Sequence, residues 1–211
     1  MERNDKTIGV VSGIIANLVV VDVEDPVGQN EICFVDHGEE RLMAEVIKVT
    51  GKKAYIQVFE STRGLRPGSK VYFEGHMLEV TLGPGILSRN YDGLQHDLDK
   101  MEGVFLKRGE YTDPLDHDKK WAFKPLASEG DEVEAGSWLG EVEENGMPHR
   151  IMVPFKLEGT YQVKSVVSEG EYTIDDEIAV IEDNNGETIS VNMIQKWPVK
   201  MPIKTFKEKP R

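Results

Sequence analysis

Two similar segments of this chain start 40 residues apart. SEGDEVEAGSWLGEVEE (128–144) aligns with SEGEYTIDDEIAVIEDN (168–184). In both, Ser-Glu-Gly and an acidic residue precede a turn, an apolar pair and a short predicted strand. A small β unit of this kind cannot bury its own apolar face, so two copies are expected to pair about a pseudo-twofold axis. The duplication therefore predicts a β-sandwich over residues 113–190.

The first part of the chain has a different pattern, in which Val- and Ile-rich runs alternate with turns. Such runs are typical of short strands. About six strands of this length, closely spaced by turns, predict a small closed β-barrel within residues 1–77. The fold class is therefore mainly all-β. The predicted strand regions are 7–24, 31–35, 41–49, 54–60, 70–75 and 77–82.

Two segments differ from these β-rich regions. Residues 78–112 are glycine-rich and are predicted to form a connector with one short helix over 94–101. We expect residues 83–105 to be less well supported than the regions on either side. Residues 191–211 are predicted to be an extended linker, because Pro198, Pro202 and Pro210 are incompatible with a helix interior.

Composition excludes several function classes. The net charge of −13 argues against a nucleic-acid-binding protein, which needs a basic face to neutralise phosphates. The single cysteine, Cys33, cannot form an intramolecular disulfide, which favours a cytoplasmic location. No segment has the length and apolarity of a membrane span, so we expect contact with a membrane only through partner proteins.

The polar residues that could carry chemistry do not form a recognisable catalytic or metal-binding pattern. No two histidines have the three-to-five-residue spacing of a metal-binding pair. The acidic clusters lie in Gly- and Ser-rich segments typical of solvated turns, and the serines lie outside a nucleophile motif. We therefore predict no catalytic and no metal-binding residue in this chain. The residues considered are His37, His76, His96, His117, His149, Ser12, Ser137, Cys33, Asp113/Asp116/Asp118, Glu129/Asp131/Glu132/Glu134 and Asp175/Asp176/Glu177.

The stretch TLGPGILSRNYDGLQHDL (81–98) contains a glycine-rich turn, Gly83-Pro84-Gly85. A loop of this kind can cradle a phosphate, because its free N–H groups can point at an anion. A nucleotide-binding P-loop also needs a lysine and a hydroxyl at fixed spacing, in the pattern G-x-x-x-x-G-K-[ST]. The pattern is absent from residues 1–211, so we predict no nucleotide-binding site and no cofactor in this chain.

The duplicated β unit is similar to the domains that carry biotin or lipoyl groups. In those domains the modified lysine lies on an exposed hairpin between the two halves. The corresponding hairpin here, EENGMPH (143–149), has no lysine, and Lys156 and Lys164 lie away from its tip. The fold is thus expected without the carrier chemistry, although a carrier-like or scaffold β-domain protein without catalytic activity stays an alternative function.

Ten motifs, in order along nearly the whole chain, resemble the catalytic A subunit of V-type and archaeal-type rotary ATPases. They are GVVSG (9–13), EVI (45–47), AYIQVFESTRGLRPG (54–68), LGPGIL (82–87), YDGLQ (91–95), FLKRG (105–109), KKWAF (119–123), IMVP (151–154), GEYT (170–173) and QKWPV (195–199).

This resemblance implies a crown barrel (1–77), a connector of the nucleotide-binding core (78–112), a bulge domain (113–190) and a linker toward the nucleotide-binding domain (191–211). It implies a parent subunit that uses MgATP and couples ATP hydrolysis or synthesis to proton or sodium transport. The implied partners are B subunits in an alternating ring and the central and peripheral stalk subunits. The sequence departs from the family pattern in stopping at Arg211, before the P-loop. We therefore expect a truncated, inactive portion whose role is assembly; an engineered fragment of a longer subunit is the simplest account, and a natural truncation stays an alternative.

Overall fold

The structure is a computed structural model that describes residues 7–100, 109 and 112–202. The described residues divide into two compact units. The first contains residues 7–79, 109 and 198–202, and the second contains residues 80–100 and 112–197. In the described residues, both units consist of strands and turns, and the second also contains one 3₁₀ turn, η1 (Leu98–Lys100). The all-β fold class predicted from the sequence is confirmed.

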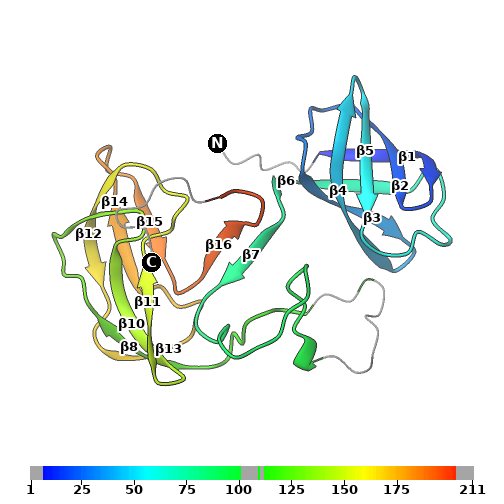
Figure 1. The fold of residues 1–211 in the computed structure, drawn as a ribbon. Coiled ribbons are helices and arrows are strands. Elements are labelled where there is room, and N and C mark those ends of the chain that lie inside the picture. The colour runs from blue at the N-terminus through cyan, green and yellow to red at the C-terminus, as the bar shows by residue number, and fades with distance from the viewer. Residues whose placement is uncertain (1–6, 101–108, 110–111, 203–211) are drawn as a thin grey trace. The chain divides into compact units, whose positions relative to one another are not determined.

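The first unit is a closed barrel with the strand order β1-β2-β5-β4-β3-β6 (Figure 1). Alternate residues of each strand point inward, and the resulting core is rich in valine. Gly9 is required where β1 crosses this core, because a Cβ there would lie 2.5 Å from Cγ1 of Val21. The strands are β1 (Ile8–Ile15), β2 (Leu18–Val23), β3 (Glu31–His37), β4 (Glu40–Thr50), β5 (Lys53–Val58) and β6 (Lys70–Met77).

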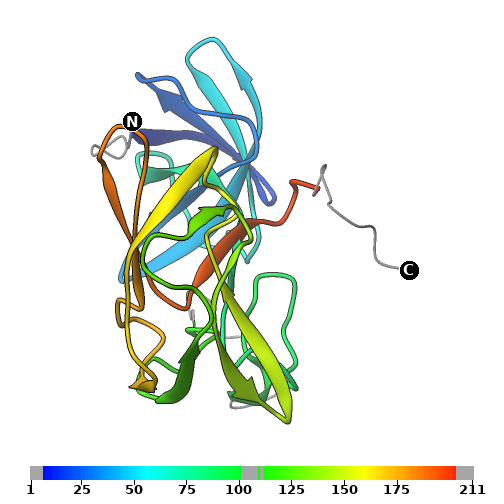
Figure 2. The same cartoon turned by 90° about the vertical axis from the view of Figure 1, so that its left-hand side faces the viewer.

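The second unit contains two four-stranded sheets, β11-β10-β8-β13 and β15-β14-β12-β9. The long β10–β11 hairpin of the first sheet is yellow-green in Figures 1 and 2. A shared apolar core that includes Phe123, Leu139 and Ile181 lies within this unit. The strands are β8 (Trp121–Pro125), β9 (Glu132–Glu134), β10 (Trp138–Glu144), β11 (Met147–Met152), β12 (Thr160–Val166), β13 (Gly170–Tyr172), β14 (Ala179–Glu182) and β15 (Thr188–Val191).

The two sheets explain how the duplicated segments pair. The first copy and the strands that flank it (residues 121–152) supply β8, β10 and β11 to one sheet, and the second copy and its flanking strands (residues 160–191) supply β12, β14 and β15 to the other. The remaining short strands are exchanged: β13 of the second copy pairs with β8, and β9 of the first copy pairs with β12. Each copy thus completes the sheet of the other. The paired β-sandwich predicted from the repeat is confirmed, whereas the exchange of β9 and β13 was not predicted.

Two details differ from the sequence prediction. The strand predicted at 77–82 is β7 (Glu79–Leu82), which lies outside the barrel and pairs with β16 (Gln195–Pro198), within the segment expected to be a linker. The helix predicted over 94–101 is wrong, because only η1 forms and residue 101 lies outside the described residues. Instead, Oδ1 of Asp92 accepts hydrogen bonds from the N–H groups of Leu94 and His96, and this side-chain pairing favours a turn over a helix.

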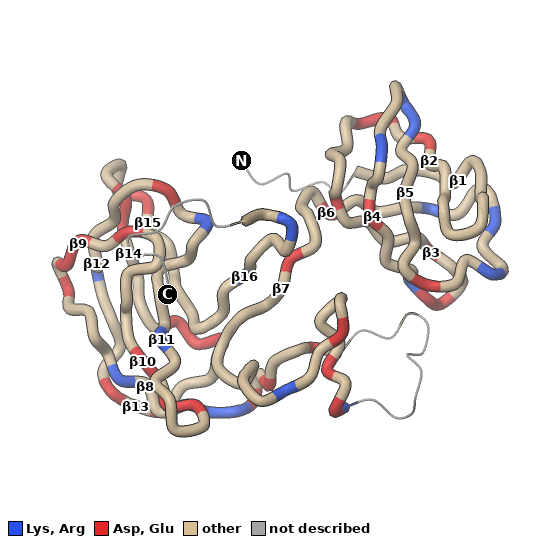
Figure 3. Tube along the Cα trace, in the orientation of Figure 1, with Lys and Arg blue, Asp and Glu red and all other residues tan. Residues whose placement is uncertain are grey.

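Figure 3 shows acidic and basic positions interspersed along the strands and turns of both units. Within the described ranges, no helix has the length and apolar character that a membrane crossing needs.

Candidate functional site

The glycine-rich loop singled out in the sequence folds against the end of the β10–β11 hairpin. Gly85 has a φ of +104°, which a residue with a Cβ rarely adopts. The loop is tightly placed at Gly83 as well, because a Cβ there would lie 3.0 Å from Cδ1 of Leu115 and 3.1 Å from the carbonyl oxygen of Met193. The loop therefore requires glycine for close packing and for its turn.

The N–H groups of this loop do bind an anion, and that anion is a side chain of the same unit. Oε1 of Glu144 accepts the N–H of Gly85 at 2.8 Å and the N–H of Leu87 at 3.0 Å. Oε2 of Glu144 lies 2.7 Å from Nδ1 of His149. Glu144 is only 3% exposed, so three hydrogen bonds compensate for burying its charge. The geometry of a phosphate cradle is present, but a carboxylate occupies it.

A second buried carboxylate holds the rest of the connector. Oδ2 of Asp97, which is fully buried, lies 2.6 Å from Nη1 of Arg89 and 3.7 Å from Nζ of Lys100. The Tyr91 hydroxyl donates to the carbonyl of Pro114 at 2.9 Å. Contacts with Glu144 and Pro114 thus attach residues 83–100 to the sandwich, and our expectation that residues 83–105 are less well supported than the regions on either side stays a prediction. Residues 101–105 lie outside the described residues.

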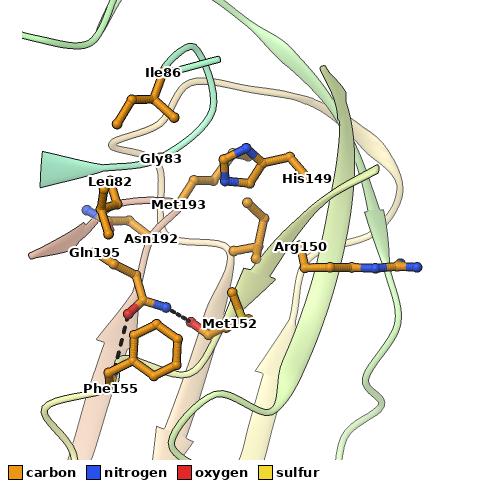
Figure 4. Close-up of a pocket in the computed structure, with 11 residues that line it drawn as sticks. Leu82, Gly83, Ile86, His149, Arg150, Met152, Phe155, Asn192, Met193 and Gln195 are labelled. Atoms are coloured by element: carbon orange, nitrogen blue, oxygen red, sulfur yellow. Dashed lines mark hydrogen bonds between the residues drawn. The ribbon is translucent and has the colours of Figure 1, made fainter. Parts of the chain in front are cut away.

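An apolar hollow of about 240 Å³ lies beside this loop (Figure 4). The Gln195 side chain crosses one side of it, accepting from the N–H of Phe155 at 3.2 Å and donating to the carbonyl of Met152 at 3.3 Å. Arg150 extends away from the hollow (Figure 4). The lining suits an apolar side chain rather than a charged ligand. Its residues are Leu82, Gly83, Ile86, His149, Arg150, Ile151, Met152, Phe155, Asn192, Met193 and Gln195.

Four of the five histidines considered in the sequence have polar neighbours. His76 lies near Glu79 and the Met77 carbonyl, and His96 and His149 bind Asp92 and Glu144. His117 has a carboxylate at each ring nitrogen, from Asp113 and Asp175. His37 lies against Gly64, where an added Cβ would be 3.3 Å from its ring.

Several side chains of the acidic clusters, and that of Ser137, accept backbone N–H groups within turns. Asp131 accepts the N–H of Ser128, Ser137 accepts that of Glu134, and Asp176 accepts that of Thr173. The Cys33 thiol is fully buried, and burial raises its pKa, as expected of a structural cysteine.

Sequence reasoning missed two contacts made by side chains distant in sequence, Glu144 with the glycine loop and Asp175 with His117. Neither has a local signal, because the partners are 57 to 59 residues apart. Among residues 7–100, 109 and 112–202, no group of three His, Cys, Asp or Glu side chains is placed to hold a metal ion. The predicted lack of catalytic, nucleotide and metal sites stays a prediction.

Two sequence models of known families match the chain, one in each unit. The model described as "ATP synthase alpha/beta family, beta-barrel domain" matches residues 4–75. The model described as "ATPsynthase alpha/beta subunit barrel-sandwich domain" matches residues 112–200.

Curated relatives agree with both matches. The chain is 45% identical over 207 residues to the V-type ATP synthase alpha chain of Borrelia garinii subsp. bavariensis, covering 97% of this chain and 36% of the relative. It is 44% identical over 207 residues to the V-type ATP synthase alpha chain of Treponema denticola, covering 97% and 35%. The chain thus spans little more than a third of the length of these relatives.

Proposed function

The chain belongs to the ATP synthase alpha/beta family, and we propose that its two units serve the assembly of a V-type rotary ATPase. It covers the barrel and barrel-sandwich domains of the alpha, or catalytic A, subunit. The complete subunit would bind MgATP and couple ATP hydrolysis or synthesis to proton or sodium transport. The 211 residues themselves would be inactive and would contribute structure rather than chemistry.

The observation that carries this proposal is the occupied glycine loop. A nucleotide phosphate would have to displace the Glu144 carboxylate from two backbone N–H groups and from His149. That exchange is unfavourable, because it would leave a buried charge without partners. The loop most suited to a phosphate therefore supports a structural role, in which it joins the connector to the barrel-sandwich unit.

The outer surface of the barrel supports a contact with partner subunits. Ile8 and Val10 on β1 are 51% and 46% exposed, and they line a hollow of about 540 Å³ that also includes Lys53. Exposed apolar side chains gathered at one place often mark a protein contact. We assign this surface to the barrel of a B subunit in an alternating ring. Stalk subunits would be further partners, and the assembly would place the chain on the cytoplasmic side, peripheral to the membrane.

Two measurements on the chain test this proposal. Isothermal calorimetry should detect no MgATP binding, since micromolar affinity would contradict the structural role. Co-elution with a B subunit of a related V-type ATP synthase should be lost in Val10→Asp. The control is Gln57→Asp, which adds the same charge at an exposed position of β5 outside the hollow. Retained binding in Val10→Asp, or equal loss in both variants, would exclude β1 as the contact.

A further inference from the structure

His117 joins two loops of the barrel-sandwich unit at the place where the exchanged strand β13 enters the first sheet. The β13–β8 ladder has only three residue pairs, and its last pair is Tyr172 with Trp121. His117 precedes β8 by four residues and Asp175 follows β13 by three. A contact between them therefore closes the end of a very short ladder.

Both ring nitrogens of His117 face a carboxylate. Nδ1 lies 2.6 Å from Oδ2 of Asp175, and Nε2 lies 2.8 Å from Oδ2 of Asp113. Nδ1 is hydrogen-bonded to Asp175 and Nε2 lies at ion-pair distance from Asp113, so the imidazolium, unlike the neutral ring, is attracted by both carboxylates. The carboxylates face opposite nitrogens of one ring, so the three groups cannot converge on a single metal ion.

The charged groups nearby come from three segments. In the loop of His117, Oδ1 of Asp116 accepts the N–H groups of Asp118 and Lys119, while Nζ of Lys119 lies over the Trp121 ring. In the β13–β14 loop, Oδ2 of Asp176 accepts the N–H of Thr173, and Asp175 and Glu177 are its neighbours in the chain. In the connector, Lys100 binds the carbonyl of Asp113 and the carboxylate of Asp97. Of these groups, Asp113 and Asp175 are the two that lie against the ring.

We propose that His117, Asp113 and Asp175 form a pH-dependent clasp that holds β13 in the first sheet. The clasp is closed while the ring is charged. When the ring loses its charge, its electrostatic attraction to both carboxylates is lost, and the contact at the end of the three-pair ladder weakens. The clasp is a property of the isolated unit and does not depend on the proposed assembly.

The direction of the pH effect follows from the contacts. The hydrogen bond to Asp175 raises the pKa of His117 above its usual 6.5, partial burial opposes this, and Asp113 raises it further. A group whose pKa is raised on folding stabilises the fold fully below its unfolded pKa. This contribution is lost as pH rises through the folded pKa, so the clasp opens at a pH above 6.5.

An NMR titration of the whole chain tests the clasp, with the His117 signal assigned by its absence in His117→Gln. The pKa should lie above 6.5 in the wild type, fall toward 6.5 in Asp175→Asn, and stay unchanged in Asp118→Asn. Asp118 is a matched control because its side chain lies in the same loop without a contact to the ring. A wild-type pKa at or below 6.5, or a pKa that does not fall in Asp175→Asn, would overturn the proposal.

Hydrogen exchange provides a second readout at the strand itself. Protection factors of the amides of residues 170–172 should fall severalfold between pH 6 and pH 8.5 in the wild type. They should be lower and independent of pH in His117→Gln. Equal pH dependence in the two proteins would mean that His117 does not hold β13, whatever its pKa.

Discussion

Glu144 and Gly85 lie 59 residues apart in the chain, and Oε1 of Glu144 accepts the N–H of Gly85 at 2.8 Å. The same oxygen accepts the N–H of Leu87. Two backbone donors directed at one oxygen are the arrangement by which glycine-rich loops bind phosphate. In this chain the arrangement has a structural use, because it fastens the connector to the end of the β10–β11 hairpin.

Replacement of Glu144 with alanine should be strongly destabilising. The loop N–H groups and His149 would lose a buried acceptor, and unsatisfied buried donors cost on the order of 2–4 kcal/mol in total. Urea unfolding followed by tryptophan fluorescence measures this loss. The exposed neighbour Glu143 is the control, and Glu143→Ala should change the free energy of unfolding by less than about 0.5 kcal/mol. Similar values for the two variants would argue against the fastening role of Glu144.

Gly140 is required for packing between β10 and β8. A Cβ there would lie 2.2 Å from Cε2 of the buried Phe123 ring and 2.8 Å from the carbonyl oxygen of Lys124. Gly140→Ala should therefore lower the melting temperature and cost about 1–3 kcal/mol or more, because the core must shift to admit the methyl group. Gly93→Ala serves as the control, since a Cβ at Gly93 has no atom within 4 Å. An unchanged melting temperature in Gly140→Ala would show that Phe123 can move aside.

The ionised Asp92 side chain should stabilise the fold at neutral pH and lose this effect in acid. Partial burial raises its pKa, but the side-chain and backbone hydrogen bonds from His96, with that from Leu94, outweigh burial and hold the pKa below its usual 3.8. A carboxyl whose pKa is lowered on folding stabilises the fold above its unfolded pKa, and the contribution is lost as pH falls through the folded pKa. Asp92→Asn should thus be less stable than the wild type at pH 7.

This difference between Asp92→Asn and the wild type should shrink as pH falls below 3.8. Melting temperatures of both proteins between pH 2.5 and pH 7 measure it. A difference that stays constant over this range would mean that the charge of Asp92 is not the source of the stabilisation. Asp183 cannot serve as the control position in this test, because hydrogen bonds from residues 185–187 lower the pKa of its carboxyl group as well.

Cys33 should be protected from thiol reagents in the native protein. Its side chain is fully buried within the barrel, where its Sγ lies 3.6 Å from the carbonyl oxygen of Ala44. The reagent reacts only with an accessible thiolate, so labelling should occur only when the barrel opens. The rate should be on the order of a thousandfold below that in denaturant. Rapid labelling under native conditions would show that the β3–β4 hairpin opens independently.

The sequence by itself determined the class of both units. Alternating apolar residues and frequent turns predicted the barrel, since a strand with one buried face requires a period of two. The repeat at an offset of 40 residues predicted a paired β-sandwich, and its two sheets with exchanged strands agree. The order of the motifs indicated the family, and the matched domains confirm it.

Only the tertiary structure decided what the polar side chains do. The sequence showed a glycine loop without a lysine, but not that Glu144 fills it, and two acidic clusters, but not that Asp113 and Asp175 share His117. Local patterns are set by φ, ψ and side-chain periodicity over a few residues. Contacts between residues almost sixty positions apart depend instead on how strands are exchanged between sheets, and the spacing of residues along the chain carries no record of that exchange.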